Sequence, residues 1–345
     1  MSAAPRVVTF GEIMLRLGPP GFERLLQSPM LTATFGGGEA NVAVSLAQFG
    51  VQSDYVTRLP GHAIGDAVVR ALRAEGVGVS HIVRGGSRLG IYFTETGASQ
   101  RASTVIYDRA HSAISEIPAD AVKWDAVMAG AAWFHVTGIT PALGERGVAA
   151  TTAAVDAAKK AGATVSVDLN YRKKLWTEAQ AQAVMRPMMA SVDVVIANEE
   201  DLQSVLGVHV SGADVTTGTL NVDAYREAAE SVTQKLGPTL VAITLRESLS
   251  ASDNGWSAVL WDGGAGVLHR SQHYNVRLVD RIGGGDSFAA GLIYGLVTGR
   301  SKEDALRFAV AASALKQTIP GDFNRVSVAE VDALAKGDAS GRVQR

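Results

Sequence analysis

Apolar residues recur along this chain with two different spacings, which alternate regularly in its second half. Short apolar runs typical of buried strands occupy Trp133–Val136, Thr164–Asp168, Val192–Ala197, Thr239–Leu245 and Val276–Val279. Segments with apolar positions at helical spacing lie between them, at Ala142–Ala161, Glu178–Ala190, Glu199–Leu206 and Ala224–Leu236. This order predicts an α/β fold of three layers, in which helices cover both faces of a mainly parallel central sheet.

The two ends of the chain continue the pattern. The further elements that it predicts are strands at Arg6–Phe10 and Tyr55–Leu59, an antiparallel edge hairpin of Ser257–Trp261 and Val267–Ser271, and helices at Glu39–Phe49, His62–Glu75, Ser287–Thr298, Lys302–Gln317 and Val328–Ala335. The polar stretch Val208–Asn221 is rich in glycine and threonine, so we expect a surface loop there.

The section near residue 100 departs from this order. Arg88–Thr96 and Ser103–Arg109 are rich in strand-forming residues, and Gly97–Gln100 between them has the composition of a turn. They predict a β-hairpin inserted into a helix-rich chain, and we expect it to pair with Glu12–Leu17. A small sheet of this kind could cover a site as a lid.

No internal repeat or low-complexity linker divides the chain. We therefore expect a single domain over residues 1–345. The lid, formed by residues of about 12–34 and 88–110, would belong to that domain.

Composition narrows the classes of function. The chain has 345 residues, of which 47% are hydrophobic, so it can bury a large core. A formal charge of -2 and a pI near 6.4 give no electrostatic reason to expect nucleic acid or a membrane surface as a partner. The absence of cysteine excludes disulfides, thiolate nucleophiles and zinc–thiolate sites. With no signal-peptide pattern and no long apolar run, we expect a soluble, cytoplasmic protein.

Three glycines and an aspartate precede the helix predicted from Ser287. Gly283–Gly285 allow backbone N–H groups to approach a ligand closely, because no Cβ intervenes. The helix adds the positive end of its dipole, which suits phosphate. Asp286 would repel a phosphate, so its expected task is to accept a proton beside one. The alternative is a plain glycine turn with Asp286 as the N-cap of the helix.

A second glycine cluster, Gly36–Gly38, precedes the helix that contains Asn41. In an open α/β sheet ligands bind beyond the carboxyl ends of the strands, so one cluster could hold a polar substrate and the other a phosphate. Asn41 can both donate and accept, which suits a sugar hydroxyl, although it could instead cap its own helix. The chain has no P-loop, G-x-G-x-x-G, H-E-x-x-H or G-x-S-x-G motif.

Together the two clusters resemble the two signatures of the ribokinase-like (PfkB) sugar kinases. The matching stretches are Gly37–Ala43 and Asp280–Phe288, and the similarity spans nearly the whole chain. The second signature usually reads D-T-x-G-A-G-D-x-F, so Arg281 replaces threonine and Gly284 replaces alanine. The resemblance implies a ribokinase-like three-layer α/β/α domain with a small β-sheet lid. It also implies a general base, Asp286, and an anion hole made of Gly283, Gly284 and Gly285.

Within that family the chain is most similar to the 2-keto-3-deoxygluconate kinases, on Gly90–Phe93, Tyr107–Ala113 and Asp168–Arg172. The substrate contacts that the resemblance implies are Gly36, Gly37, Gly38, Asn41, Tyr92, Tyr107, Arg109, Arg172, Asp286 and Asp322. The chemistry agrees, because a keto acid carries a carboxylate, which arginine binds bidentately. The alternatives are surface ion pairs for the two arginines and packing within the hairpin for the two tyrosines.

Asn198–Asp201 resembles the N-x-x-E element of the family, with aspartate where glutamate is usual. It implies that Asn198 and Asp201 hold hydrated Mg2+ through water. The alternative is an acidic first helical turn that complements the helix dipole. For the nucleotide, the expected contacts are Asn198, Thr244, Arg246, Gly283 and Gly285. Arg246 stands where many relatives have a glycine turn.

The resulting expectation is an ATP- and Mg2+-dependent kinase that phosphorylates the C6 hydroxyl of 2-keto-3-deoxy-D-gluconate, with a need for a monovalent cation such as K+ left open. The alternatives are a kinase of fructose, ribose or 5-dehydro-2-deoxygluconate, and a non-catalytic sugar- or nucleotide-sensing protein. An exposed lid sheet could pair with a second copy, so we expect a homodimer or a higher homo-oligomer.

Overall fold

Strands that are buried on both faces form the central sheet of the computed structural model, which describes residues 5–210, 222–338 and 341. Within these ranges the sheet has nine strands, in the order β14-β13-β12-β11-β10-β9-β1-β4, with β15 paired to β13. The parallel strands are β1 (Arg6–Phe10), β4 (Gln52–Val56), β9 (Trp133–Thr137), β10 (Thr164–Asp168), β11 (Val194–Ala197) and β12 (Leu240–Ser248). Antiparallel pairing adds β13 (Asp253–Asp262), β14 (Val267–Arg270) and β15 (Tyr274–Arg277) at one edge. The mainly parallel sheet and its antiparallel edge are confirmed.

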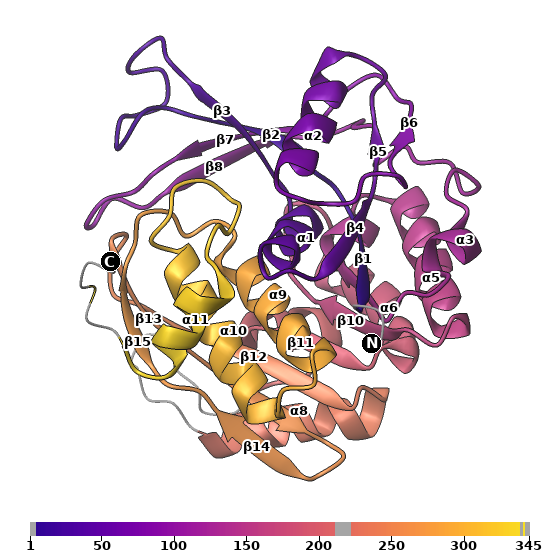
Figure 1. Cartoon of the computed structure of the whole chain (residues 1–345), viewed down its shortest axis with the longest axis vertical. Coiled ribbons are helices and arrows are strands. Elements are labelled where there is room, and N and C mark those ends of the chain that lie inside the picture. The colour runs from indigo at the N-terminus through magenta and orange to yellow at the C-terminus, as the bar shows by residue number, and fades with distance from the viewer. Residues whose placement is uncertain (1–4, 211–221, 339–340, 342–345) are drawn as a thin grey trace.

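Helices cover both faces of this sheet (Figure 1). Successive side chains of a strand point to opposite faces, so Val194 and Ile196 of β11 pack in one apolar cluster and Val195 in another. The first cluster includes residues of α1 (Gly38–Gln48), α9 (Gly284–Val297), α10 (Lys302–Lys316) and α11 (Val328–Ala335). The second includes residues of α3 (Trp124–Met128), α5 (Glu145–Lys160), α6 (Glu178–Met188) and α8 (Val222–Leu236). The three-layer architecture is therefore confirmed.

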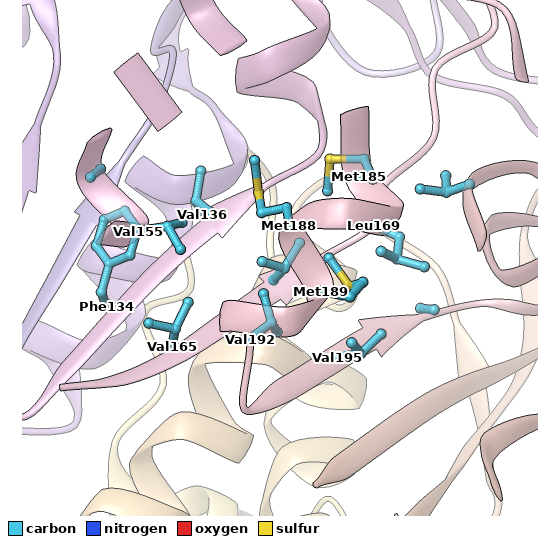
Figure 2. Packing of buried hydrophobic residues seen from close by; sticks show 14 of the residues in the cluster. Phe134, Val136, Val155, Val165, Leu169, Met185, Met188, Met189, Val192 and Val195 are labelled. Carbon is cyan, nitrogen blue, oxygen red and sulfur yellow. The ribbon is translucent and has the colours of Figure 1, made fainter. Parts of the chain in front are cut away.

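Part of the second cluster is seen from close by in Figure 2. Phe134 of β9 and Val195 of β11 project from the sheet toward the layer that contains Met185 and Met188 of α6. Methionine is unbranched and adapts to irregular gaps, which suits the seam between the helix and the β-branched surface of the strands. The two clusters together hold the strand ends in fixed positions.

A separate four-stranded sheet stands at one end of the molecule (Figure 1). Its order is β3 (Thr32–Gly36), β2 (Met14–Gly18), β7 (Ile91–Glu95) and β8 (Thr104–Asp108). β2 and β7 pair in parallel, which confirms the expected pairing of the hairpin with the N-terminal excursion. A third apolar cluster joins α1 to α2 (Ala63–Ala74), beside the short pair of β5 (Arg58–Leu59) and β6 (Val83–Arg84). We call the four-stranded sheet the small sheet.

The strand predicted at Val276–Val279 is wrong in position and direction. β15 covers Tyr274–Arg277 and pairs antiparallel with β13 instead of joining the parallel strands. Beyond it the chain leaves the sheet, and the N–H of Val279 donates to the carbonyl of Gln317 at 2.9 Å. A short apolar run therefore marks extended backbone here, but its spacing does not say which partner the backbone takes.

Other predicted elements are divided or shifted. The strand predicted at Tyr55–Leu59 is split between β4 and β5, which belong to different sheets. The helix predicted at Ala142–Ala161 is two helices, α4 (Ile139–Ala142) and α5, because Gly144 adopts a φ of 124° between them. The remaining pieces are the turn Met189–Ser191 after α6, and α7 (Glu199–Asp201) followed by the π-helical turn Leu202–Leu206.

Two further points concern the limits of the described ranges. Of the loop predicted at Val208–Asn221, residues 211–221 lie outside the described residues. None of the helices in the described ranges is long and apolar enough to cross a membrane.

Candidate active site

A cavity of about 530 Å³ lies between the carboxyl ends of the parallel strands and the small sheet. Its wall includes Asp168 at the end of β10 and Met14 of the small sheet. All the site residues predicted from the sequence line it: Gly36, Gly37, Gly38, Asn41, Tyr92, Tyr107, Arg109, Arg172, Asn198, Asp201, Thr244, Arg246, Gly283, Gly284, Gly285, Asp286 and Asp322. The segments that follow the parallel strands meet at one edge of the central sheet, as expected for an open α/β fold, and the small sheet adds Gly36, Tyr92 and Tyr107 from the other side.

Asn41 and Asp286 join the two glycine clusters. Nδ2 of Asn41 donates to Oδ2 of Asp286 at 2.7 Å, while Oδ1 of Asn41 accepts from the N–H of Gly37 at 3.3 Å. Asn41 thus binds the N-cap residue of its own helix and also faces the site. Burial raises the pKa of Asp286 to about 6, against the lowering effect of the Asn41 hydrogen bond. Asp286 is a carboxylate that can take a proton close to neutral pH.

The helix α9 begins at Gly284, and its N-cap is Gly283, with a φ of 83° and no side-chain cap. Asp286 is the third residue of the helix, so the interpretation of Asp286 as the N-cap is wrong. By contrast, α6, α10 and α11 each begin with a capping serine or threonine side chain. The N–H of Gly284 donates to the carbonyl of Arg281 at 3.2 Å, while within the described residues those of Gly283 and Gly285 form no hydrogen bond. Unpaired N–H groups at a helix start suit an anion.

Asp322 belongs to a buried network. Its carboxylate accepts from the hydroxyl of Tyr92 at 2.7 Å and from Nη1 of Arg16 at 2.6 Å, while Nη2 of Arg16 binds Asp280 at 2.6 Å. Nζ of the fully buried Lys316 donates to the carbonyl of Asp280 at 3.1 Å. Tyr92 and Asp322, both predicted to contact the substrate, therefore contact one another. Arg16 and Tyr92 tie the small sheet to the start of the glycine loop.

The two arginines predicted to bind a carboxylate have different surroundings. Arg109 is 9% exposed, donates through Nε to Glu12 at 2.8 Å, and lies over the ring of Tyr107 at 5.3 Å. Its ion pair is buried, so the alternative of a surface ion pair does not apply. Arg172 is exposed, and Nη1 donates to the carbonyl of Tyr171 at 2.9 Å. Because Arg172 forms no ion pair within the described ranges, it is the one of these two arginines whose guanidinium is available to an anion.

Comparison with known proteins shows which family this chain belongs to. The sequence pattern described as pfkB family carbohydrate kinase matches residues 4–325. The chain belongs to this family. A 2-dehydro-3-deoxygalactonokinase from Haloferax volcanii is 33% identical over 335 residues, 97% of this chain and 98% of that protein. A 2-dehydro-3-deoxygluconokinase from Bacillus subtilis is 27% identical over 94% of this chain and 93% of that protein.

The crystal structure of 2-dehydro-3-deoxygluconokinase from Thermotoga maritima is similar throughout. Its TM-score is 0.93 and its identity is 50%, over 96% of this chain and 100% of that chain. The ribokinase-like fold is confirmed by this likeness. As a carbohydrate kinase of the PfkB family, the protein is a phosphotransferase with an alcohol group as acceptor.

In this PfkB kinase, Asn198 and Asp201 form a capping box at the start of α7. Oδ1 of Asn198 accepts from the N–H of Asp201 at 2.8 Å, and Oδ2 of Asp201 accepts from the N–H of Asn198 at 3.3 Å. The acidic first turn offered as the alternative is therefore present. It does not exclude a water-mediated contact, because each carboxylate oxygen has a further lone pair. Across the described ranges, no group of three or more His, Cys, Asp or Glu side chains is arranged to hold a metal.

Thr244 and Arg246 lie on β12, which runs three residues beyond the predicted strand, to Ser248. The hydroxyl of Thr244 donates to the carbonyl of Ala197 at 3.4 Å, so it ties β12 to the end of β11. Arg246 shares its face of the strand, because side chains two residues apart point the same way. The extension of β12 therefore carries Arg246 to the wall of the cavity.

Glu39 lies behind the glycine cluster Gly36–Gly38, and the sequence did not single it out. It is 1% exposed, and Oε1 accepts from the N–H and hydroxyl of Thr137 and the hydroxyl of Thr140, each at 2.8 Å. Burial raises its pKa to about 7. The sequence feature that could have pointed to Glu39 was its position inside the motif Gly36–Asn41. Glu39 anchors the start of α1 to the end of β9, which positions the glycine cluster.

Arg16 was also missed. The apolar residues of its segment, Leu15 and Leu17, suggest the opposite face of the strand, but the structure buries Met14, Arg16 and Gly18 more deeply. A charged residue within a strand of a predicted lid was the available signal. Its acidic partners lie 264 and 306 residues away, so no local pattern could supply them.

Proposed function

We propose that this kinase transfers the γ-phosphate of ATP to the C6 hydroxyl of 2-keto-3-deoxy-D-gluconate, the sugar acid also called 2-dehydro-3-deoxygluconate. The observation that carries the proposal is the contact between Asp286, in the first turn of the uncapped α9, and Asn41 of the other glycine cluster. A carboxylate able to take a proton lies beside N–H groups that suit phosphate. Phosphate transfer to a hydroxyl needs both a base that takes the proton of the hydroxyl and donors that stabilise the charge of the phosphate.

Asp286 accepts the proton of the C6 hydroxyl while that oxygen forms a bond to the γ-phosphorus and the bond from phosphorus to the ADP oxygen breaks. A pKa of about 6 leaves Asp286 mostly deprotonated at pH 7, yet still basic enough for the transfer. The N–H groups of Gly283 and Gly285 and the start of α9 stabilise the charge on the transferring group, with the N–H of Gly284 already engaged.

The carboxylate of the sugar acid would lie against Arg172. The charge of Arg109 is already balanced by Glu12, so its contribution is a hydrogen bond held in a fixed direction. The exposed guanidinium of Arg172 has no such partner within the described ranges. The charge of Arg172 acts on Asp168, Asp201 and Asp286 only through space, so a neutral sugar would leave it without a direct ion pair, which favours an acid as the substrate.

The cavity wall fits a hydrated magnesium ion carried by the nucleotide. Asn198 and Asp201 would hold it through water, and Thr244 and Arg246 would contact the nucleotide. Bound to the phosphates, magnesium neutralises part of their charge during the transfer. Because Mg2+ keeps much of its water shell, it does not need a dense cluster of protein carboxylates.

The small sheet, from residues of about 12–34 and 88–110, would act as a lid within a single domain of residues 1–345. Tyr92 and Tyr107 of the small sheet line the cavity opposite the ends of the parallel strands. Closure over the sugar acid would exclude water, which competes with the hydroxyl for the phosphate.

A second candidate substrate is 2-keto-3-deoxygalactonate, the C4 epimer of the first. The observation that favours it is the 33% identity to the 2-dehydro-3-deoxygalactonokinase of Haloferax volcanii. Arg172 would contact the same carboxylate in both epimers. The two substrates would therefore differ only in the contacts of the C4 hydroxyl with the cavity wall.

The test is a coupled ADP-release assay with 2-keto-3-deoxygluconate, its galactonate epimer, 5-dehydro-2-deoxygluconate, fructose and ribose. The expected result is the highest kcat/KM for 2-keto-3-deoxygluconate. Higher kcat/KM for a neutral sugar would overturn the proposal, and no ADP release with any of the five would favour a sensing role. Repeating the assay in K+, in Na+ and with neither determines whether a monovalent cation is needed.

We also infer that two copies pair through their small sheets. Large apolar side chains on this part of the chain are exposed, namely Phe22 at 58%, Leu26 at 78%, Met30 at 65% and Ile106 at 50%. Exposed large apolar side chains on one part of the fold favour association. Sedimentation equilibrium of the wild type and of Ile106→Glu tests the dimer, which the substitution should weaken.

A further inference from the structure

Arg281 and Arg246 lie on the cavity wall with no acidic partner. Both line the cavity, Arg281 half-buried and Arg246 exposed, and within the described ranges neither side chain forms a hydrogen bond or an ion pair. Burial lowers the pKa of Arg281, and the positive charge of Arg246 lowers it further. Two like charges therefore stand close enough to disfavour one another.

The acids next to these arginines are bound elsewhere. Asp280, which precedes Arg281, pairs with Arg16 at 2.6 Å. Glu247, which follows Arg246 on β12, points to the opposite face of the strand and pairs with His273 at 3.3 Å. The fold thus gathers two guanidinium groups and turns the adjacent carboxylates away. An anion from outside the protein is the partner that would balance them.

A buried amide beside the pair also lacks a partner. Asn254 of β13 is 1% exposed and lines the cavity, and neither its amide nitrogen nor its amide oxygen forms a hydrogen bond within the described residues. Trp256 stands opposite Arg246 in the register of β12 and β13, and its buried indole N–H is also unpaired. Buried donors without partners cost free energy that a ligand oxygen would recover.

We propose that Arg281 and Arg246 form a clamp for the β- and γ-phosphates of the nucleotide donor, with Arg281 against the phosphoryl group that is transferred. This assignment rests on the proposed kinase function and deepens it. Arg281 lies just before Gly283, the N-cap of α9, so its charge reaches the same anion as the unpaired N–H groups. The forked N–H groups of arginine match phosphate oxygens, and a polyphosphate can bridge two guanidinium groups.

The clamp has a consequence for the free protein. The two arginines repel one another until phosphate binds, so removing either charge should leave the stability of the free protein unchanged or raise it. An arginine with a structural role would behave in the opposite way, because its loss would leave a partner unpaired. The stability of the free variants therefore separates the two roles.

The test uses the full-length variants Arg281→Ala, Arg246→Ala and Arg281→Lys. The matched control is Arg277→Ala, which removes an exposed charge on β15 outside the cavity. Calorimetry with ATP, ADP and adenosine should show ATP bound about 10-fold more weakly by each alanine variant, which corresponds to 1.4 kcal/mol, and adenosine bound as in the wild type. ADP, which lacks the transferred phosphoryl group, should be weakened by Arg246→Ala and much less by Arg281→Ala. Arg281→Ala should also lower kcat on the order of 10²-fold, with partial recovery in Arg281→Lys.

Unchanged ATP binding in both alanine variants would overturn the clamp, as would equal weakening of ATP and adenosine. A fall in the unfolding temperature of the free Arg281→Ala protein would also count against it. The comparison of ATP with adenosine does not depend on the sugar. If the wild type phosphorylates no sugar acid, the proposed substrate fails while this comparison still tests the clamp.

Discussion

Asn41 and Asp286 are 245 residues apart in the sequence, and their side chains meet at 2.7 Å. The hydrogen bond links the first turn of α1 to the first turn of α9, which brings the two glycine clusters to one point. It also favours the ionised form of Asp286, while burial favours the neutral form and has the larger effect. The balance gives a carboxylate that is ionised at neutral pH but remains a usable base.

Replacement of this base tests the proposed chemistry. Asp286→Asn should lower kcat by a factor of about 10² to 10⁴, the usual contribution of a general base, with ATP affinity nearly unchanged. The control is Asp304→Asn, because Asp304 is likewise the third residue of its helix, α10, and lies outside the cavity. Steady-state kinetics of both variants decides. Near-normal kcat in Asp286→Asn would refute the assignment of the base.

The pKa of Asp286 predicts the acid limb of the pH profile. The base works only when deprotonated, so kcat/KM, which reports the ionisation of the free enzyme, should be level well above pH 6 and fall about tenfold per pH unit well below it. Asn41→Ala removes a hydrogen bond that lowers this pKa, so the limb should move to higher pH. Rates from pH 4.5 to about 8 are the measurement. A limb that stays in place would show that Asn41 does not set the ionisation of the base.

Arg172 should determine the preference for an acid. Arg172→Ala should raise KM for the keto acid by about tenfold or more, with a much smaller effect on a neutral sugar, because the lost contact is to the carboxylate. Lys173→Ala is the matched control, since it removes the neighbouring positive charge outside the cavity. Equal changes in KM for both sugars would contradict the carboxylate assignment.

The buried guanidinium of Arg16 should matter for stability. Arg16→Ala leaves Asp280 and Asp322 buried without their cation, so the free energy of unfolding should fall by about 3–5 kcal/mol. Arg307→Ala removes an exposed pair with Glu303 on α10 and should cost about 0.5 kcal/mol or less. Urea denaturation of both variants gives the comparison. Similar losses would mean that the network contributes no more than a surface ion pair.

Two glycines at the start of α9 should respond differently to alanine. A Cβ on Gly283 would lie 2.2 Å from the carbonyl oxygen of Asp322, at a positive φ, so Gly283→Ala should displace the loop and lower both stability and kcat. A Cβ on Gly285 meets nothing within 4 Å, and alanine favours a helix, so Gly285→Ala should fold at least as well as the wild type. Thermal unfolding of the two variants tests the contrast. A destabilised Gly285→Ala variant would show that the room for a Cβ and the backbone φ do not predict the effect of alanine at these two positions.

The spacing of apolar residues was enough to predict the layers of the fold, because parallel strands buried on both faces and amphipathic helices are local patterns. The two glycine clusters and Asp286 could likewise be found from the sequence, since a helix start that follows glycines is encoded within a few residues. The strand at Val276–Val279 was misplaced, because an apolar run does not reveal the direction of its partner.

The partners of the charged residues were decided by the tertiary structure alone. From the sequence, Arg109, Arg172 and Arg281 are equivalent as cations. In the structure, Arg109 is paired with Glu12, 97 residues away, whereas Arg172 and Arg281 form no ion pair within the described ranges. Contacts across such separations depend on how the small sheet and the strand ends pack together, and no local spacing encodes them. The sequence therefore determined which groups are present in the site, and the tertiary structure decided which of them are left to bind a ligand.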